Sequence, residues 1–269
     1  MIKRRSVVLC SAVLTACVGV TPAHAGQVDV TVFVGRAYPV HDERLTIRPS
    51  TPSLPGVQIN VSGDPAIRPD GGLVLGAALA FEAGIVALEA RVDGTQVGFD
   101  LSGARYDLRG FDGPLAGLAG SVTIGDGRFD AKRFYLVSGN VRVRTPGPIG
   151  VVASGGISVL PDVTITGSVP VSLQLGGIPL GVESRLRLTV APGETGHRFG
   201  ANAGAGLRVG GGRVALTGEV RAFFFRDYDL RFEAEGAPDI VVAPVAEIVD
   251  GIRFRPIIVN AQAGLVVRF

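Results

Sequence analysis

The chain has 269 residues, with 26 lysines and arginines against 24 aspartates and glutamates. Three of the basic residues lie within the first five positions, and the remaining basic and acidic residues nearly balance, so the charge predicts no nucleic-acid partner. Both cysteines, Cys10 and Cys17, lie in the first 25 residues. A chain cleaved after residue 25 would therefore contain no disulfide, no thiolate metal site and no catalytic cysteine.

Residues 1–25 have the pattern of an export signal. A basic start at positions 3–5 precedes an apolar stretch, which ends in the small-x-small motif Ala23-His24-Ala25. We therefore expect cleavage after Ala25 and one domain over 26–269. The segment Leu14–Cys17 also fits the pattern that precedes a lipid-modified cysteine, so lipidation of Cys17 is the alternative.

The rest of the chain predicts β-strands. The nearest candidate for a transmembrane helix, over 73–90, is interrupted by Glu82 and Glu89. Instead, apolar residues alternate with polar or small ones in segments of about ten residues, which is typical of strands with one face in lipid and the other in a lumen. Eight segments have this pattern: 28–34, 73–81, 86–92, 135–143, 150–160, 199–209, 213–227 and 257–269. They predict an all-β, antiparallel up-and-down transmembrane β-barrel.

The connections between these segments alternate in length. Short ones lie at 83–84, 145–148 and 210–212, whereas long ones cover 39–70, 108–127, 161–195 and 229–253. Bacterial outer-membrane barrels have an even number of strands, short periplasmic turns and long external loops. The alternation therefore predicts that the long loops lie outside the cell.

The third long connection leaves the number of strands open. Its segments 163–175 and 182–190 also alternate between apolar and polar residues. They form either a hairpin that rises above the membrane or two further wall strands, which would make ten. We favour eight strands.

Several charged residues fall on the predicted inward faces. The interior of an eight-stranded barrel is just wide enough for side chains to fill, so charges there must pair with one another. Arg144 and Arg268 belong to this inward set, and the expected ion-pair network consists of Glu89, Arg91, Arg142, Arg208, Glu219 and Arg221. A structural core of ion pairs is the favoured interpretation, and a gated pore or a proton relay is the alternative.

Few residues suggest catalysis. The histidines after residue 25 are His41 and His197, both near predicted loops. A lipid-modifying enzyme could use His197 with Thr195 or Ser184, but no spacing selects these residues. We expect no catalytic site, no cofactor and no metal.

The chain has no tryptophan, so an aromatic girdle at the membrane surfaces would consist of Phe and Tyr. The candidates near strand ends or on outward faces are Phe33, Tyr38, Phe81, Tyr135, Phe199, Phe223 to Phe225 and Phe269.

Two stretches carry a resemblance to a known family: GHRFGANAGAGLRVGGGRVALTGEVRAFFF (196–225) and RFRPIIVNAQAGLVVRF (253–269). They resemble the last strands of small outer-membrane barrels similar to the transmembrane domain of outer membrane protein A and to outer membrane protein X. The resemblance implies that Phe269 is an assembly signal read by the barrel-assembly machinery. It also implies that Glu219 pairs with Arg221 in the lumen, and Glu89 with Arg91. It does not imply cell-wall anchoring, because no peptidoglycan-binding segment follows the barrel strands.

The expected function is that of an integral protein of the outer membrane with a structural or surface-interaction role. Its partners would be outer-membrane lipid and lipopolysaccharide, and the protein would be a monomer whose external partner the sequence does not identify. One alternative is a narrow channel or carrier for small apolar molecules, and another is the lipid-modifying enzyme. A lipocalin-like carrier, with its apolar faces inside, is the remaining one.

Overall fold

The structure of the chain is a computed structural model that describes residues 26–40, 43–44, 58–63, 66–110, 117–161, 163, 165–179, 184–190, 196–235, 252–254 and 256–269. The expected export signal, with both cysteines, lies outside these residues. Within them, no helix is long and apolar enough to cross a membrane.

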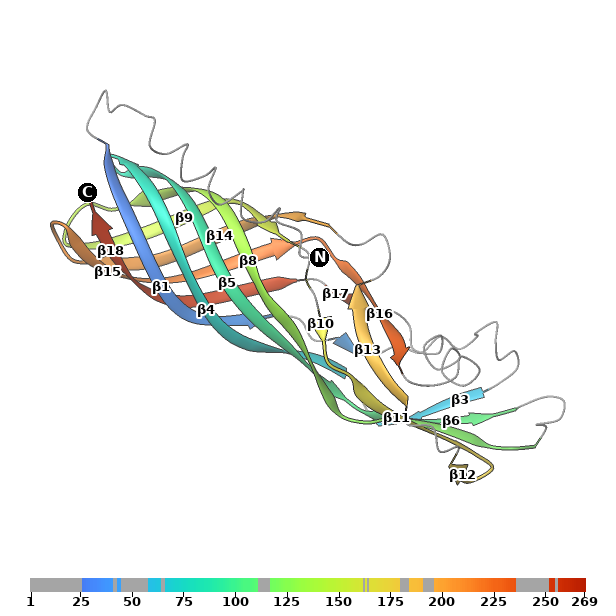
Figure 1. Cartoon of the computed structure of the whole chain (residues 1–269). Helices are drawn as coiled ribbons and strands as arrows, with labels where there is room; N and C mark the ends of the chain where they lie inside the picture. The colour runs from blue at the N-terminus through green and yellow to red at the C-terminus, as the bar shows by residue number, and fades with distance from the viewer. Residues whose placement is uncertain are drawn as a thin grey trace, which may run out of the picture.

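Eight long antiparallel strands close into a barrel (Figure 1). Each strand pairs with the next of the eight in chain order, and the last pairs with the first. The strands are β1 (Gln27–Pro39), β4 (Ala66–Ala83), β5 (Val86–Ser102), β8 (Gly127–Arg144), β9 (Ile149–Leu160), β14 (Arg198–Val209), β15 (Val214–Phe225) and β18 (Ile257–Arg268). Each contains one of the eight alternating segments or most of it. The prediction of an all-β, up-and-down barrel of eight strands is therefore confirmed.

One end of the barrel carries both the first strand's start and the chain's last residue. Only Gly84 and Ile85 join β4 to β5 there, and Gly84 has a φ of 68°, a left-handed conformation that favours glycine. At the same rim, the amide of Phe269 donates to the carbonyl oxygen of Val28 over 2.9 Å. We call this the turn end, and we call the opposite end, from which the four long connections leave, the loop end (Figure 1).

Successive side chains of each strand point to opposite faces of the wall, as strand geometry requires. In β15, Leu216 and Val220 are exposed on the outer face, whereas Arg221 is buried in the lumen. This alternation gives the barrel an apolar outside and a charged inside.

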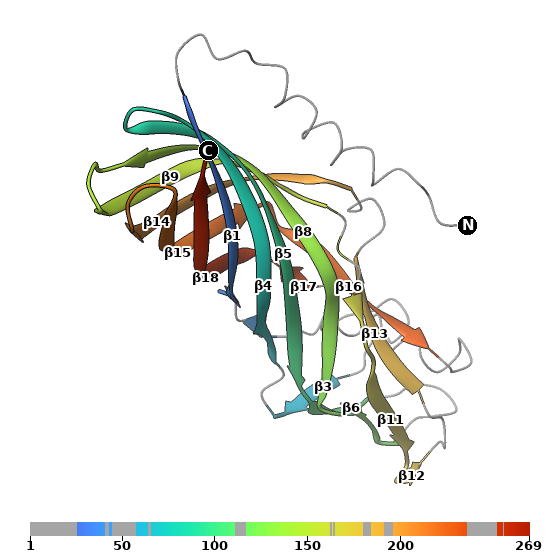
Figure 2. The ribbon, with the colours of Figure 1, turned by 60° about the vertical axis from the view of Figure 1, so that its left-hand side comes forward.

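Three neighbouring strands are longer than the others. Strands β4, β5 and β8 have 17 or 18 residues, whereas the other five have 12 or 13. They run past the loop end and bend away from the barrel (Figure 2). Register shifts occur between Gly71 and Val74 and between Thr95 and Val97. Such bulges increase the bend and twist of a strand.

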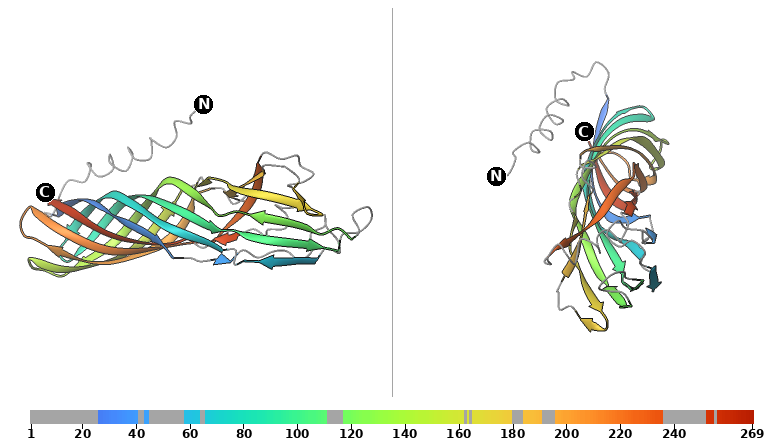
Figure 3. Two further views of the ribbon diagram at one scale, coloured as in Figure 1. Left: turned by 90° about the horizontal axis from the view of Figure 1, so that it is seen from below. Right: turned by 90° about the vertical axis from the view of Figure 1, so that its right-hand side faces the viewer.

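A second sheet continues from these extended strands, and we call it the loop sheet (Figure 3). Its order is β17-β16-β13-β11-β7-β6-β3, with β12 paired to β11. Its strands are β3 (Gln58–Ser62), β6 (Ala104–Arg109), β7 (Gly120–Ile124), β11 (Val169–Leu175), β12 (Ile178–Pro179), β13 (Ser184–Val190), β16 (Tyr228–Glu235) and β17 (Ile252–Phe254). All four long connections contribute to it. Two short strands, β2 (Glu43–Arg44) and β10 (Ile165–Thr166), pair with β4 and β8.

The third long connection forms a hairpin that does not enter the barrel wall. Strands β11 and β13 pair with each other, and their outer neighbours are β7 and β16, from the connections before and after. The hairpin interpretation is therefore confirmed, and the ten-stranded alternative is wrong. The sequence did not reveal that the other loops supply its neighbours.

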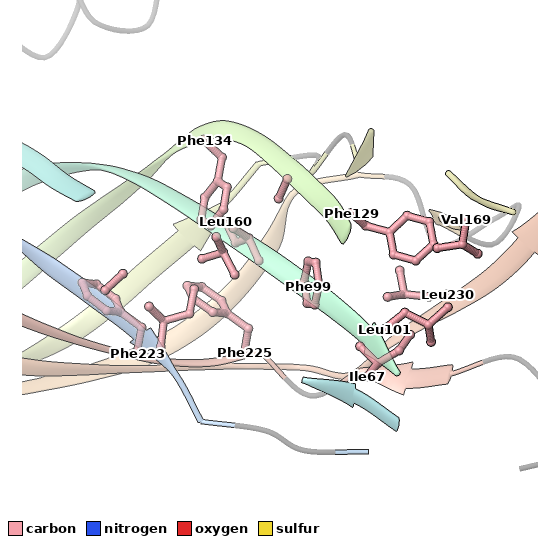
Figure 4. Packing of buried hydrophobic residues seen from close by; sticks show 14 of the residues in the cluster. Ile67, Phe99, Leu101, Phe129, Phe134, Leu160, Val169, Phe223, Phe225 and Leu230 are labelled. Atoms are coloured by element: carbon pink, nitrogen blue, oxygen red, sulfur yellow. The ribbon is translucent and has the colours of Figure 1, made fainter. Parts of the chain in front are cut away.

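A hydrophobic core joins the barrel to the loop sheet (Figure 4). Phe134, Leu160 and Phe225 lie at the loop end of the lumen, and Phe129 and Val169 continue the same cluster toward the loop sheet. The barrel interior is thus divided into a charged part near the turn end and an apolar part near the loop end.

Candidate functional site: the charged lumen

Charged side chains fill the turn end and the middle of the barrel. The six residues of the expected network all point inward: Glu89, Arg91, Arg142, Arg208, Glu219 and Arg221. The side chain of Glu219 is 12% exposed, and the other five are more deeply buried. The structure brings the six together through ion pairs that they share with further residues.

Those further residues are Arg144 and Arg268, which were expected to point inward, and three carboxylates that sequence reasoning missed. The missed residues are Asp29, Glu82 and Asp93. Strand alternation was the available signal, because Asp93 is two residues from Arg91, and Asp29 and Glu82 each follow a residue predicted to point outward.

The first group of ion pairs lies near the turn end, and we call it the turn-end cluster. It consists of Asp29, Glu82, Arg142, Arg144, Arg208 and Arg268. Nε of Arg268 donates to Oδ1 of Asp29 over 3.0 Å, and Arg208 also donates to Asp29. Glu82 accepts hydrogen bonds from Arg142 at 3.0 Å, Arg144 at 3.0 Å and Arg268 at 2.8 Å. Two carboxylates thus hold four guanidinium groups.

The second group lies in the middle of the barrel, and we call it the middle cluster. It consists of Glu89, Arg91, Asp93, Glu219 and Arg221. Arg91 binds Asp93 with two nitrogens, over 2.8 and 3.0 Å, and donates to Glu219 over 2.9 Å. Arg221 donates to Glu219 over 2.7 Å and to Glu89 over 3.0 Å. Such charge-assisted, two-pronged contacts fix both distance and orientation.

The two clusters complement each other in charge. The turn-end cluster has more guanidinium groups than carboxylates, and the middle cluster has more carboxylates than guanidinium groups. Arg142 joins them, because its Nη1 lies 3.4 Å from Oε2 of Glu89 while its Nη2 contacts Asp29 and Glu82. The lumen therefore holds one continuous and nearly neutral network.

An apolar layer closes the lumen toward the loop end. Phe223 is fully buried and stacks against Phe225, with ring centroids 6.5 Å apart. Leu136 and Ile258 are buried at inward positions of their strands. The expectation that Phe33, Phe223 and Phe225 belong to an outer girdle is wrong, because all three are buried at inward positions; Phe224, between two of them, is exposed on the outer face.

A small cavity lies between the two clusters. Its volume is about 20 Å³, and Arg91, Arg208 and Gln262 are among its lining residues. Oε1 of Gln262 is buried without a hydrogen-bond partner among the described residues. A polar space of this size has room for about one water molecule, so this cavity is not an aqueous channel.

The residues considered for catalysis are dispersed or not described. His197 is exposed just before β14, and Ser184 begins β13 in the loop sheet. His41 and Thr195 lie outside the described residues. In the described part of the chain, no group of three or more His, Cys, Asp or Glu side chains is placed to hold a metal ion.

Phe269, the expected assembly signal, lies at the turn end. Its main chain is fixed by the two hydrogen bonds with Val28, whereas its residue surface is 76% exposed. The ring therefore contributes little to packing within the barrel.

Comparisons with known proteins add little to this picture. No family model matches the sequence, and no curated protein matches it significantly. Among solved structures, the crystal structure of Pseudomonas aeruginosa OccK7 (OpdD) shows 8% identity and a TM-score of 0.10, over 91% of this chain and 98% of that one. A TM-score this low supports no conclusion about fold or function. The resemblance to small outer-membrane barrels is thus supported only as far as the closed eight-stranded barrel.

Proposed function

We propose that this protein is an exported, integral barrel of the bacterial outer membrane. In this proposal the ion-paired lumen is a structural core that conducts nothing, and the loop sheet is a surface for interaction outside the cell. The protein would be a monomer, with membrane lipid and lipopolysaccharide around it, and no catalytic role is assigned.

The observation that carries the proposal is an apolar band around the barrel. Every barrel strand contributes an exposed aliphatic side chain to its outer face: Val32, Leu75, Leu88, Val141, Val151, Leu207, Leu216 and Leu265, each between 41% and 65% exposed. A contiguous exposed apolar surface of this kind indicates contact with a membrane or a partner. Because the band runs round the whole barrel, a surrounding bilayer fits it better than a partner on one side.

Aromatic and charged residues support the same placement. Tyr38 and Tyr135 are exposed near the loop end, and Phe269 is exposed at the turn end, as in the aromatic girdles of membrane barrels. Beyond the loop end, the outer face of the extended strands becomes charged, with Arg128 bonded to Asp130 over 3.0 Å. The change from apolar to charged residues would mark the membrane surface.

The inside of the barrel supports a structural role for the lumen. The buried charges are paired, and the apolar layer lies between them and the loop end. A barrel of eight strands is just wide enough to be filled by side chains. The network therefore replaces the hydrophobic core that a water-soluble protein would have.

Cysteine labelling in cells tests the proposal, because the chain has no cysteine after residue 25. We would introduce Ser172→Cys, at an exposed position of the loop sheet, and Gly211→Cys, at an exposed position of the turn end where a side chain meets no other atom. A maleimide that does not cross membranes should label position 172 in intact cells and position 211 only after lysis. Extraction with alkaline carbonate should leave both variants in the membrane pellet.

Other results would reject the proposal. Release of the protein by carbonate would indicate a water-soluble carrier, with the apolar band covered by something other than lipid. Labelling of position 211, but not of position 172, in intact cells would reverse the orientation and remove the loop sheet from the cell surface.

A further inference from the structure

The turn end of the barrel carries more positive than negative charge. The two clusters together contain six arginines and five carboxylates, so one guanidinium group has no matching carboxylate. The excess lies in the turn-end cluster, where Asp29 and Glu82 face four arginines. Two of these, Arg144 and Arg268, have side chains that are each 19% exposed. The unmatched charge is therefore accessible from outside the barrel.

The two exposed arginines share one acceptor atom. Nη2 of Arg144 and Nη2 of Arg268 both donate to Oε2 of Glu82, over 3.0 and 2.8 Å. The two guanidinium groups thus lie side by side, and like charges this close repel each other unless enough negative charge is near. Among the described residues, Arg144 forms no other hydrogen bond through its side chain, and Nη1 of Arg268 forms none. Both arginines therefore have donors left for a further acceptor.

A third arginine lies beside Arg268. The amide of Arg268 donates to the carbonyl oxygen of Arg213 over 2.8 Å, and Val214 faces Val267 in the ladder that follows. This register places Arg213 opposite Arg268. Arg213 is exposed, and its side chain has no ion pair or hydrogen bond within the described part of the chain. Like charges directly opposite each other on neighbouring strands are destabilising, so an anion bound between them would relieve an unfavourable contact.

The last residue lies at the same rim but is not bound to these arginines. The main-chain oxygen of Phe269 accepts a hydrogen bond from the amide of Val28, over 3.3 Å. The described ion pairs of Arg144 and Arg268 are with side-chain carboxylates alone. The remaining donors at this rim are thus available to an acceptor from outside the protein.

We propose that the turn end binds one phosphate group, held by Arg144, Arg213 and Arg268. A phosphate group is negatively charged and presents several oxygen acceptors, which match the fork of a guanidinium group. A carboxylate has fewer oxygens, so three guanidinium groups fit a phosphate better. The group is either inorganic phosphate or the phosphate of a lipid headgroup, which present the same chemistry to the arginines. The inference goes beyond the proposed function and does not depend on the direction in which the barrel crosses a membrane.

Calorimetric titration of the purified protein in a non-ionic detergent tests the proposal, with sodium phosphate as the probe and sodium chloride of equal ionic strength as the reference. Arg213→Gln removes a side chain without a partner in the described structure, so the barrel should still fold, which circular dichroism checks. Arg226→Gln is the matched control, because Arg226 is exposed just past the opposite end of β15 and its loss removes the same charge. We expect one phosphate to bind to wild type and to Arg226→Gln, and Arg213→Gln to bind it about tenfold more weakly, since a charge-assisted hydrogen bond is lost.

A second measurement distinguishes the two sources of phosphate. Protein in micelles that contain phosphatidylglycerol would be analysed by native mass spectrometry, with the same two variants. Retention of one phosphatidylglycerol that is lost in Arg213→Gln but kept in Arg226→Gln would assign the site to a lipid headgroup, whereas Arg213-dependent binding of inorganic phosphate alone would assign it to the free ion. Absence of saturable binding of both probes to wild type, or an equal loss in the two variants, would overturn the site. That result would leave the proposed function untouched, because neither measurement depends on where the protein lies in the cell.

Discussion

Two Arg–Asp pairs in this chain have the same sequence spacing but opposite surroundings. Arg91 and Asp93 lie 2.8 Å apart in the lumen, with side chains 2% and 0% exposed. Arg105 and Asp107 lie 2.9 Å apart in the loop sheet, with side chains 56% and 35% exposed. The first pair is buried within a network that includes Glu219, and the second is exposed.

Arg91→Met should lower the free energy of unfolding by about 3–5 kcal/mol, because it leaves buried carboxylates without a counter-ion. Arg105→Met should change it by at most about 1 kcal/mol, because water and salt screen an exposed pair. Urea unfolding of the barrel in detergent, followed by circular dichroism, measures both. Equal effects of the two substitutions would contradict the structural role of the lumen network.

Tyr106 is a buried residue of the loop sheet with an unusual hydroxyl group. The residue is 1% exposed, and the hydroxyl has no hydrogen-bond partner among the described residues. Burial raises the pKa of Tyr106 to about 12. Since the folded pKa lies above the unfolded value of 10.0, the neutral phenol favours the fold below pH 10 and loses this contribution as the pH rises toward 12.

Tyr106→Phe should therefore stabilise the protein by about 1 kcal/mol at neutral pH, because it removes an unsatisfied buried hydroxyl. It should also remove the last step of the tyrosinate absorbance titration. Tyr135→Phe, at an exposed position, is the control and should leave that step in place. Loss of stability in Tyr106→Phe would mean that the hydroxyl is hydrogen-bonded after all.

At the scale of the element, the closing strand β18 combines packing with an expected recognition role. Its inward residues are buried in the lumen, but the Phe269 that follows it is 76% exposed. An exposed terminal ring contributes little to stability, so an effect of its removal would arise from recognition during assembly.

Phe269→Ala, which keeps the main-chain hydrogen bonds with Val28, should lower the amount of folded, heat-modifiable barrel in cells, while refolding of the purified protein in detergent should be unchanged. Phe199→Ala, which removes another exposed aromatic ring at the loop end, should leave assembly normal. Normal assembly of Phe269→Ala would count against the recognition role, and an equal loss on refolding in detergent would indicate a structural one.

The elements also show why strand lengths were underestimated from the sequence. The alternating pattern predicted β4, β5 and β8 at about half their length. The register shifts at Gly71/Val74 and Thr95/Val97 change the phase of the alternation. A period of two can be followed on each side of a bulge but not across it, so the sequence pattern predicts loops where these strands continue.

At the scale of the whole molecule, the charged network and the apolar layer lie in series along the barrel axis. An ion crossing the barrel would have to displace paired charges and then enter a hydrocarbon-like layer. Each step carries a desolvation cost of several kcal/mol. The barrel should therefore have no steady conductance, although it spans the membrane in the proposed function.

Recordings of single molecules in a planar bilayer test this expectation, with insertion confirmed independently by protease protection of the reconstituted barrel. We expect no stable current steps at moderate voltage. A large and persistent current would show that the lumen opens, and it would favour the pore interpretation of the same charged residues.

Sequence alone determined the eight barrel strands, the inward or outward direction of most of their residues and eight of the lumen charges. These properties are local, because alternation along one strand fixes which residues share a face, whatever that strand pairs with. Chain order supplied the rest of the barrel, since each wall strand pairs with the next.

Only the tertiary structure decided the loop sheet and the partners of each lumen charge. Backbone ladders are alike for all strands, so nothing in β7 or β16 specifies that β11 and β13 lie between them. Asp29 and Glu82 joined the network because barrel closure brings β1, β4, β8, β14 and β18 around one axis. Contacts across a closed barrel depend on the register and stagger of all eight strands together, and no single segment of the sequence contains that information.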